Sequence, residues 1–220
     1  MTALFRTVLF DLDGTLLDSI RLIIDSYHHA LATHGLPAKT DQHWLAGIGT
    51  PLRVQFSEWA GEPVLFEQLI GTYRDFNIAN HDARVSAYPG AVDMVRTVQS
   101  RGFQTGLVTS KQRAGAERGL QFLGLADAMD VIVAADDVTN PKPHPEPLFI
   151  AARQLGAEPE STLYVGDSVH DMESGRAAGM QTAAALWGPF ARSILARTGP
   201  DHWLERPADL LRVIGAPRNR

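Results

Sequence analysis

The chain has 220 residues, of which 45% are hydrophobic and 20% are charged, so it can form one large domain or a domain that carries a smaller one. Its net charge is −5 and it has no basic run, which argues against nucleic acid or an anionic membrane as its main partner. Cysteine is absent, which excludes disulfides and thiolate chemistry. No secretory signal is visible, and no apolar run approaches the roughly 18 residues of a membrane helix. We therefore expect a soluble, cytoplasmic protein.

Five short apolar runs have the length of strands, and helix-like segments lie between them. Most runs are rich in Val, Leu or Phe, and runs that are apolar at every position suit strands buried on both faces of a parallel sheet. The predicted strands are Leu4–Phe10, Phe103–Thr109, Val131–Ala134, Thr162–Val165 and Thr182–Leu186. The predicted helices are Ala91–Ser100, Arg113–Leu123, Pro147–Leu155 and Asp171–Ala178. This alternation predicts an α/β fold, a doubly wound parallel sheet with right-handed crossovers.

One connection, from Ser19 to about Ser86, is far too long for an ordinary loop after a strand. It contains no convincing strand but shows helical periodicity, with one apolar face formed by Ile20, Ile23, Ile24, Tyr27 and Leu31. We expect an inserted α-helical cap at 18–85, while 1–17 and 86–220 form the catalytic core. A cap beside a strand end that carries polar residues is placed to cover that end as a lid.

Polar side chains follow the first four predicted strands at their carboxyl ends, where open α/β sheets bind ligands. The polar residues are Asp11, Asp13 and Thr15, then Thr109 and Ser110, then Lys142, and finally Asp167 and Asp171. Each motif alone could be a turn or a helix N-cap. Lys142 stands between two prolines, which restrict the backbone and so fix where its side chain starts. Four such motifs at one sheet edge point to a single site.

The chemistry that suits these side chains is phosphoryl transfer. The carboxylates offer hard oxygen ligands for Mg²⁺, while Lys142 and Thr109 can hold phosphate oxygens. Asp11 can attack phosphorus as a covalent nucleophile and form an aspartyl-phosphate. Asp13 can protonate the leaving group and later activate water. Mg²⁺ and Lys142 would then relieve the repulsion between the neighbouring carboxylates.

The motifs "DLDGTLLDS", "VTS", "NPKPHPEP" and "GDSVHD", in this order and spacing, resemble those of haloacid dehalogenase-superfamily phosphatases with a helical cap. The resemblance covers essentially the whole chain. It implies that Asp11 is the nucleophile, that Asp13 is the acid and base, and that phosphate is bound by Thr109, Ser110 and Lys142. It further implies that Mg²⁺ is bound by Asp11, Asp167 and the backbone carbonyl of Asp13, with Asp171 supporting the metal site. The dehalogenases of this superfamily lack an acid at the position of Asp13, so dehalogenation is not expected.

Within the superfamily, the chain resembles the phosphoglycolate phosphatases and the related bacterial inorganic pyrophosphatases. The stretches "YRDFNIANHD" and "DDVTNPKPHPEP" look like the pyrophosphatase branch. His144 is a departure, because many relatives carry an acidic or small residue there, and we expect it at the surface. We expect Trp44, Trp59 and Trp203 to be packing residues, and Trp187, after the fifth strand, could border the site.

The cap is expected to choose the substrate, because the core contacts are generic. Gly49 allows a close backbone approach to a ligand, and Arg53 could meet a second anionic group. On a helix, Tyr73, Asn77 and His81 form a polar stripe, which points either to the ligand or to solvent. These features suit pyrophosphate and phosphoglycolate equally well.

The sequence thus predicts a Mg²⁺-dependent phosphatase that hydrolyses a small anionic phosphate through an aspartyl-phosphate. A phosphosugar mutase that resembles β-phosphoglucomutase is the alternative, because mutases carry the same core motifs. A signalling phosphoacceptor is disfavoured, since response-regulator receivers carry their phosphorylated Asp after the third strand and lack a large helical insertion. The expected partner is a small phosphate substrate, with no nucleic acid or membrane, and the chain is expected to be a monomer or a homodimer.

Overall fold

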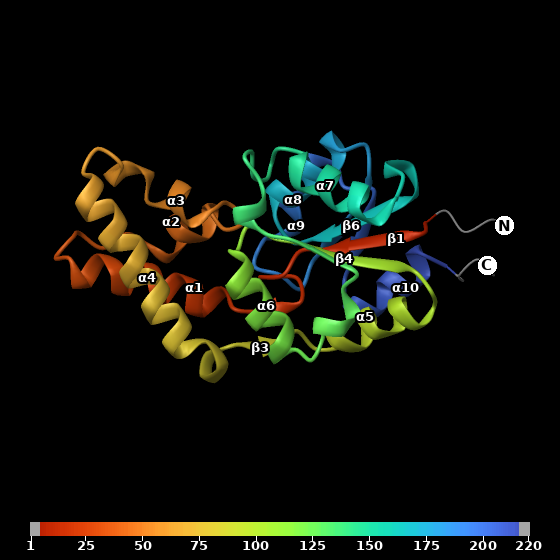
Figure 1. The fold of residues 1–220 in the computed structure, drawn as a ribbon, viewed down its shortest axis with the longest axis horizontal. Coiled ribbons are helices and arrows are strands. Elements are labelled where there is room, and N and C mark those ends of the chain that lie inside the picture. Colours follow the sequence, from red (N-terminus) through yellow and green to blue (C-terminus); the bar gives the residue numbers. More distant parts are fainter. Residues whose placement is uncertain (1–4, 216–220) are drawn as a thin grey trace.

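The computed structural model describes residues 5–215, so Leu4 of the first predicted strand and both ends of the predicted core lie outside the described residues. Six strands form a parallel sheet in the order β5-β4-β1-β6-β7-β8 (Figure 1). The strands are β1 (Thr7–Phe10), β4 (Gln104–Val108), β5 (Val131–Val133), β6 (Thr162–Gly166), β7 (Gln181–Ala185) and β8 (His202–Leu204). β1 lies between β4 and β6, so its carboxyl end is in the middle of the sheet edge.

The predicted doubly wound α/β fold and its five strands are confirmed, with differences of at most a few residues at the strand ends. The sixth strand, β8, was not predicted. It has three residues, pairs only with β7, and its His202 and Trp203 are partly exposed. A short edge strand of this kind lacks the continuous apolar run that marks a buried strand.

The helices cover both faces of the sheet. Val8 and Phe10 of β1 pack into the same cluster as residues of α5 and α6, whereas Leu9 between them packs with residues of α7. All three side chains are fully buried, which explains why Val8, Leu9 and Phe10 form a continuous apolar run. The helices of the core are α5 (Ala91–Ser100), α6 (Arg113–Phe122), α7 (Glu146–Leu155), α8 (Val169–Ala177), α9 (Arg192–Leu195) and α10 (Leu210–Val213). The first four are the predicted ones.

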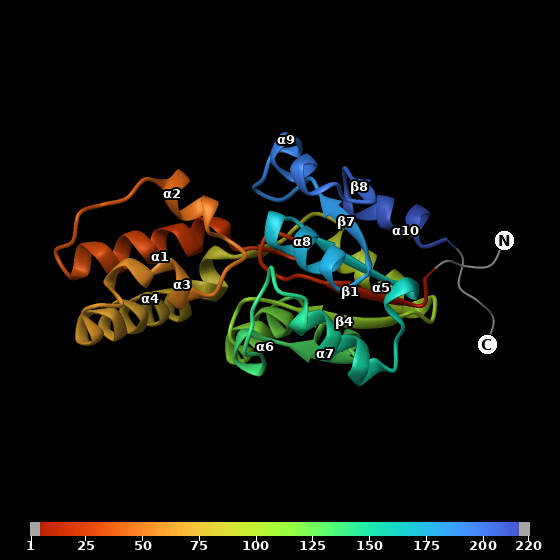
Figure 2. The ribbon, with the colours of Figure 1, turned by 90° about the horizontal axis from the view of Figure 1, so that it is seen from above.

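The long connection after β1 forms a helical lobe beside the sheet (Figures 1 and 2). Its helices are α1 (Ile20–Thr33), α2 (Asp41–Ala46), α3 (Leu52–Gln55) and α4 (Pro63–Arg84). The chain enters this lobe from β2 (Leu17–Asp18) and leaves it into β3 (Ser86–Ala87), and these two strands pair antiparallel. The entry and exit segments therefore lie side by side, next to the predicted boundaries at 18 and 85.

The lobe, hereafter the cap, has an apolar core of its own. Ile23, Tyr27 and Leu31 of α1 are buried, as the helical periodicity predicts. The ring of Tyr27 stacks on Trp44, with 4.4 Å between the ring centroids, and α1 packs along α4. Among residues 5–215, no helix combines the length and the apolar character needed to cross a membrane.

Candidate active site

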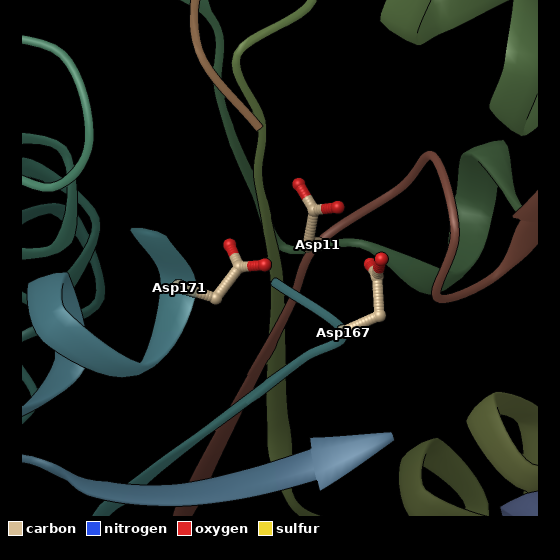
Figure 3. A group of neighbouring side chains, drawn as sticks. All are labelled: Asp11, Asp167 and Asp171. Atoms are coloured by element: carbon tan, nitrogen blue, oxygen red, sulfur yellow. The ribbon is translucent and has the colours of Figure 1, made fainter. Parts of the chain in front are cut away.

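Three carboxylates converge at the carboxyl edge of the sheet. Asp11 directly follows β1, Asp167 directly follows β6, and Asp171 lies in the first turn of α8. Because β1 and β6 are neighbours in the sheet, the first two side chains reach the same space (Figure 3). One oxygen from each of the three carboxylates lies within 4.8 Å of the others, and all three residues are at most 6% exposed. The predicted convergence of Asp11 and Asp167 is present.

The loop after β1 is built around Asp167. The hydroxyl of Thr15 donates a hydrogen bond to Asp167 Oδ1 at 2.8 Å, and Trp187 Nε1 donates to the carbonyl of Thr15 at 2.9 Å. Gly14 has a φ of +92°, and a Cβ atom there would lie 2.4 Å from Asp167 Oδ2. Only glycine therefore fits this turn. Trp187 borders the site through the loop backbone.

Lys142 links two of the carboxylates. Its Nζ donates to Asp11 Oδ1 at 2.8 Å and to Asp171 Oδ1 at 2.7 Å, and the lysine is only 3% exposed. Asp171 Oδ1 also accepts from the hydroxyl of Tyr164, while its Oδ2 accepts from the backbone N–H and the hydroxyl of Ser168. Both oxygens of Asp171 are thus occupied, and this carboxylate fixes the position of Lys142.

Burial and crowding shift the pKa values of these groups. Burial raises the pKa of Asp11 to about 7, against the opposing effect of Lys142. The pKa of Asp167 lies well above its usual range, because of burial first and then the charges of Asp171 and Asp11. Burial acts in the same direction on Asp171, but Lys142 and the hydrogen bonds outweigh it and lower that pKa. Burial alone would lower the pKa of Lys142, but Asp11 and Asp171 raise it. One lysine therefore faces three buried acids.

This donor set fits a small divalent cation. Asp167 Oδ2 is buried and has no hydrogen-bond partner among the described residues. An oxygen of this kind is costly to bury without a ligand. Asp11 and Asp167 are hard oxygen donors of the type that Mg²⁺ prefers. The surplus negative charge, the unpartnered oxygen and the short separation of the carboxylates all suit such an ion.

Asp13 is not part of this cluster and forms an ion pair with Lys111. Lys111 Nζ donates to the two carboxylate oxygens at 2.8 and 3.1 Å, and the hydroxyl of Ser19 donates to Oδ1 at 2.5 Å. Both charged side chains are only about 15% exposed and line the cavity described below. Lys111 was not predicted, although it directly follows Thr109 and Ser110 at the end of β4.

A cavity of about 630 Å³ lies between the sheet edge and the cap. Its walls bring together predicted residues of the core and of the cap. These lining residues include Asp11, Asp13, Thr109, Ser110, Gly49, Arg53 and Tyr73. Lys142, Asp167, Asp171 and His81 are not among the lining residues. The hydroxyl of Ser110 donates to the carbonyl of Gly49 at 2.6 Å, so the core and the cap touch at the mouth of the site.

The cap residues occupy different environments. Arg53 binds both oxygens of Glu67, at 3.1 and 2.5 Å. The polar stripe of α4 faces inward, because Tyr73 and Asn77 line the cavity. His81 belongs to the same stripe and is 2% exposed, but its Nδ1 lies 2.7 Å from Asp82 Oδ1, outside the cavity.

The cap approaches the core closely at Gly49. This glycine has a φ of +96°, and a Cβ atom there would lie 2.8 Å from Ser168 Oγ and 3.2 Å from His170 Cδ2. We expect Gly49→Ala to lower kcat/KM by about 10-fold or more, since the cap loop must move away from the site. Steady-state kinetics measures the effect on kcat/KM, and thermal unfolding measures the effect on stability.

Gly35 provides the matched control. It also has a positive φ, of +65°, but a Cβ atom there would meet nothing within 4 Å. Both alanine variants carry the backbone penalty of roughly 1–2 kcal/mol, whereas only Gly49→Ala adds the clash with the core. Equal kinetic effects of the two substitutions would show that the contact at Gly49 has no role in catalysis.

The fold and the site define a capped α/β hydrolase with an acidic centre at the end of the central strand. The sequence model of the haloacid dehalogenase-like hydrolases matches residues 8–185, and the chain belongs to this family. The curated relatives described next are named pyrophosphatases, and the chain is a phosphatase of the haloacid dehalogenase type.

Individual relatives span nearly the whole chain. The pyrophosphatase PpaX of Anoxybacillus flavithermus is 43% identical over 210 residues, which cover 96% of this chain and 97% of that protein. The pyrophosphatase PpaX of Bacillus pumilus is 42% identical over 212 residues, with the same coverage. Among solved structures, a hydrolase from Pseudomonas syringae has a TM-score of 0.84 at 27% identity, covering 94% of this chain and 96% of its own. A predicted phosphoglycolate phosphatase from Haemophilus somnus shares the fold, with a TM-score of 0.89 at 23% identity and coverage of 98% and 100%.

Proposed function

We propose that the protein is a Mg²⁺-dependent phosphohydrolase that forms an aspartyl-phosphate on Asp11 and acts on a small anionic phosphate, with inorganic pyrophosphate as the first candidate. The observation that carries the proposal is the position of Asp11. Its carboxylate lines the cavity, accepts from Lys142 through one oxygen, and shares a buried space with Asp167. The names of the relatives above 40% identity support pyrophosphate.

In the first step, the free oxygen of Asp11 attacks phosphorus, and the bond from phosphorus to the leaving oxygen breaks. Asp13 supplies a proton to that oxygen. For pyrophosphate, the leaving group is inorganic phosphate. Lys142 and the hydroxyl of Thr109 offset the charge on the transferred phosphoryl group.

In the second step, Asp13 takes a proton from water as the water oxygen attacks the phosphorus of the aspartyl-phosphate. The bond between phosphorus and Asp11 breaks, which releases phosphate and restores the carboxylate. Lys111 and Ser19 hold Asp13 in the orientation seen here.

Asp11 and Asp167 would hold the Mg²⁺ ion, together with the backbone carbonyl of Asp13. The bound ion supplies positive charge that offsets the phosphate and the crowded carboxylates. Asp171 would not bind the ion directly, because its oxygens already accept hydrogen bonds from Lys142, Tyr164 and Ser168. We therefore infer that Asp171 positions Lys142.

Phosphate release with Mg²⁺ should be compared for pyrophosphate, phosphoglycolate, glucose phosphates and nucleotides. The proposal expects the highest kcat/KM for pyrophosphate. A preference for phosphoglycolate would keep the mechanism and change the substrate. Interconversion of glucose phosphates without phosphate release would indicate a mutase instead.

Metal binding can be measured in two ways, by thermal unfolding and by the Mg²⁺ dependence of activity. Mg²⁺ should raise the Tm of the wild-type protein, because it binds the folded state and relieves the repulsion between buried carboxylates. Asp167→Asn removes one ligand and should shift the Mg²⁺ concentration for half-maximal activity upward by about 10-fold or more. Glu173→Gln, on the exposed side of α8, is the matched control and should behave as wild type. An Asp167→Asn variant with unchanged Mg²⁺ dependence in both measurements would contradict the assignment.

A further inference from the structure

The cavity extends from the acidic centre into the cap, and one of its walls is the helix α4. Tyr73, Arg74, Asn77 and Ile78 of this helix line it, opposite Asp11 and Asp13 of the core. Burial and then Asp13 are among the causes that raise the pKa of Tyr27, and Asp13 acts on Tyr73 in the same direction. Tyr73 of α4 and Asp13 of the acidic loop therefore face the same cavity.

Four cationic side chains within residues 5–215 line this cavity, and carboxylates already neutralise three of them. The four are Arg53, Arg74, Lys111 and Arg118. The three ion pairs are Arg53–Glu67, Lys111–Asp13 and Arg118–Asp82, with closest nitrogen–oxygen distances of 2.5, 2.8 and 3.1 Å. Pairing of this kind leaves little net positive charge to attract a ligand.

Arg74 is the exception in the described part of the chain. It is half-buried, lines the cavity, and makes neither an ion pair nor a side-chain hydrogen bond with the described residues. The carboxylate whose pKa it lowers through space is Glu67, which Arg53 already binds through both oxygens. Arg74 thus lines the cavity and carries guanidinium donors that no described residue uses.

We propose that Arg74 determines specificity by binding a second anionic group, carried by the leaving group of the substrate. Its planar guanidinium can donate two parallel hydrogen bonds to a phosphate or a carboxylate. The inference rests on the proposed function, in which Asp11, which lines the same cavity, takes the transferred phosphoryl group. The substrate class is then a phosphate whose leaving group is itself anionic, such as pyrophosphate, rather than a simple alkyl or aryl ester.

This assignment differs from the one predicted from the sequence, where Arg53 was the candidate for a second anion. Arg53 also lines the cavity, but its guanidinium is held by Glu67 and lies over the ring of Phe66, at 4.6 Å from the centroid. To bind a ligand, Arg53 would first have to leave a two-point ion pair at the surface, whereas Arg74 has no such contact to break.

The experiment compares ligands with and without the second anionic group. Binding of methylenediphosphonate and of methylphosphonate is measured by calorimetry in excess Mg²⁺, and turnover of pyrophosphate and of phenyl phosphate is measured alongside. The variants are Arg74→Met, Arg74→Lys and the control Arg84→Met. Arg84 is on the same helix and outside the cavity lining, and its partner Asp25 keeps an ion pair with Arg21.

Arg74→Met should weaken methylenediphosphonate binding and lower kcat/KM for pyrophosphate by about 10- to 100-fold. Methylphosphonate binding and phenyl phosphate turnover should change by less than about twofold. Arg74→Lys should recover part of the loss, and Arg84→Met should match wild type. Equal losses for both ligand types, or no loss for the diphosphonate, would overturn the inference.

The two proposals can fail separately. A wild-type enzyme that hydrolyses pyrophosphate, with Arg74→Met equally active, supports the proposed function and overturns the role of Arg74. A wild-type enzyme inactive on pyrophosphate, with selective loss of diphosphonate binding in Arg74→Met, supports the role of Arg74 and overturns pyrophosphate as the substrate.

Discussion

Replacement of Asp11 by asparagine should reduce phosphate release by about 10⁴-fold or more and leave the protein folded. The amide is nearly the same size as the carboxylate but cannot form the aspartyl-phosphate. The substitution also removes one of three crowded, buried negative charges, so we expect the Tm without Mg²⁺ to stay the same or to rise. Phosphate release and thermal unfolding of the purified variant provide the two measurements.

Asp93→Asn is the matched control for this substitution. Asp93 is exposed on α5, remote from the cavity lining, and its variant carries the same change in charge. It should retain wild-type activity. An Asp11→Asn variant with more than a few per cent of wild-type turnover would remove Asp11 from the role of nucleophile.

Lys142→Met should abolish activity and also destabilise the fold. Lys142 is 3% exposed and bridges Asp11 and Asp171, so its removal leaves two buried carboxylates without their cation. Loss of one partner from a buried ion pair typically destabilises by about 3–5 kcal/mol. Activity should fall by about 10³-fold or more, because the transferred phosphoryl group loses its positive partner. Chemical unfolding and phosphate release test the two parts.

The double variant Lys142→Met/Asp171→Asn separates stability from catalysis. It removes one of the two carboxylates that Lys142 neutralises, so part of the lost stability should return. Activity should not return, since the lysine is still absent. Recovery of activity in the double variant would show that Lys142 matters only because it neutralises Asp171.

The strands and the core site residues could be predicted from the sequence because each has a local signal. β1 and β6 are rich in apolar residues since both faces of the sheet are covered, and Asp11 and Asp167 directly follow them. The rule that parallel strands present their carboxyl ends at one edge then placed these two residues together. The same local reasoning missed β8, whose three edge residues carry no apolar run.

The pairings across the site could not be predicted in this way. Lys111 meets Asp13 across 98 positions of sequence, and the contact depends on how the end of β4 faces the loop after β1. Arg53 and Arg74 look alike as isolated cap arginines. They differ because a third side chain, Glu67, holds only the first of them. Such distinctions arise from packing between helices rather than from spacing along one helix.

Locating the phosphoryl group on the protein tests most directly whether Asp11 is the nucleophile. Asp13→Asn should slow the second step, in which water removes the phosphoryl group. This variant is mixed with ³²P-pyrophosphate and Mg²⁺, quenched in acid and digested, and the labelled peptide is sequenced. The label should be on Asp11, and no label should appear on a variant that also carries Asp11→Asn. Label on a different residue, or a burst of free phosphate without any labelled protein, would contradict this role of Asp11.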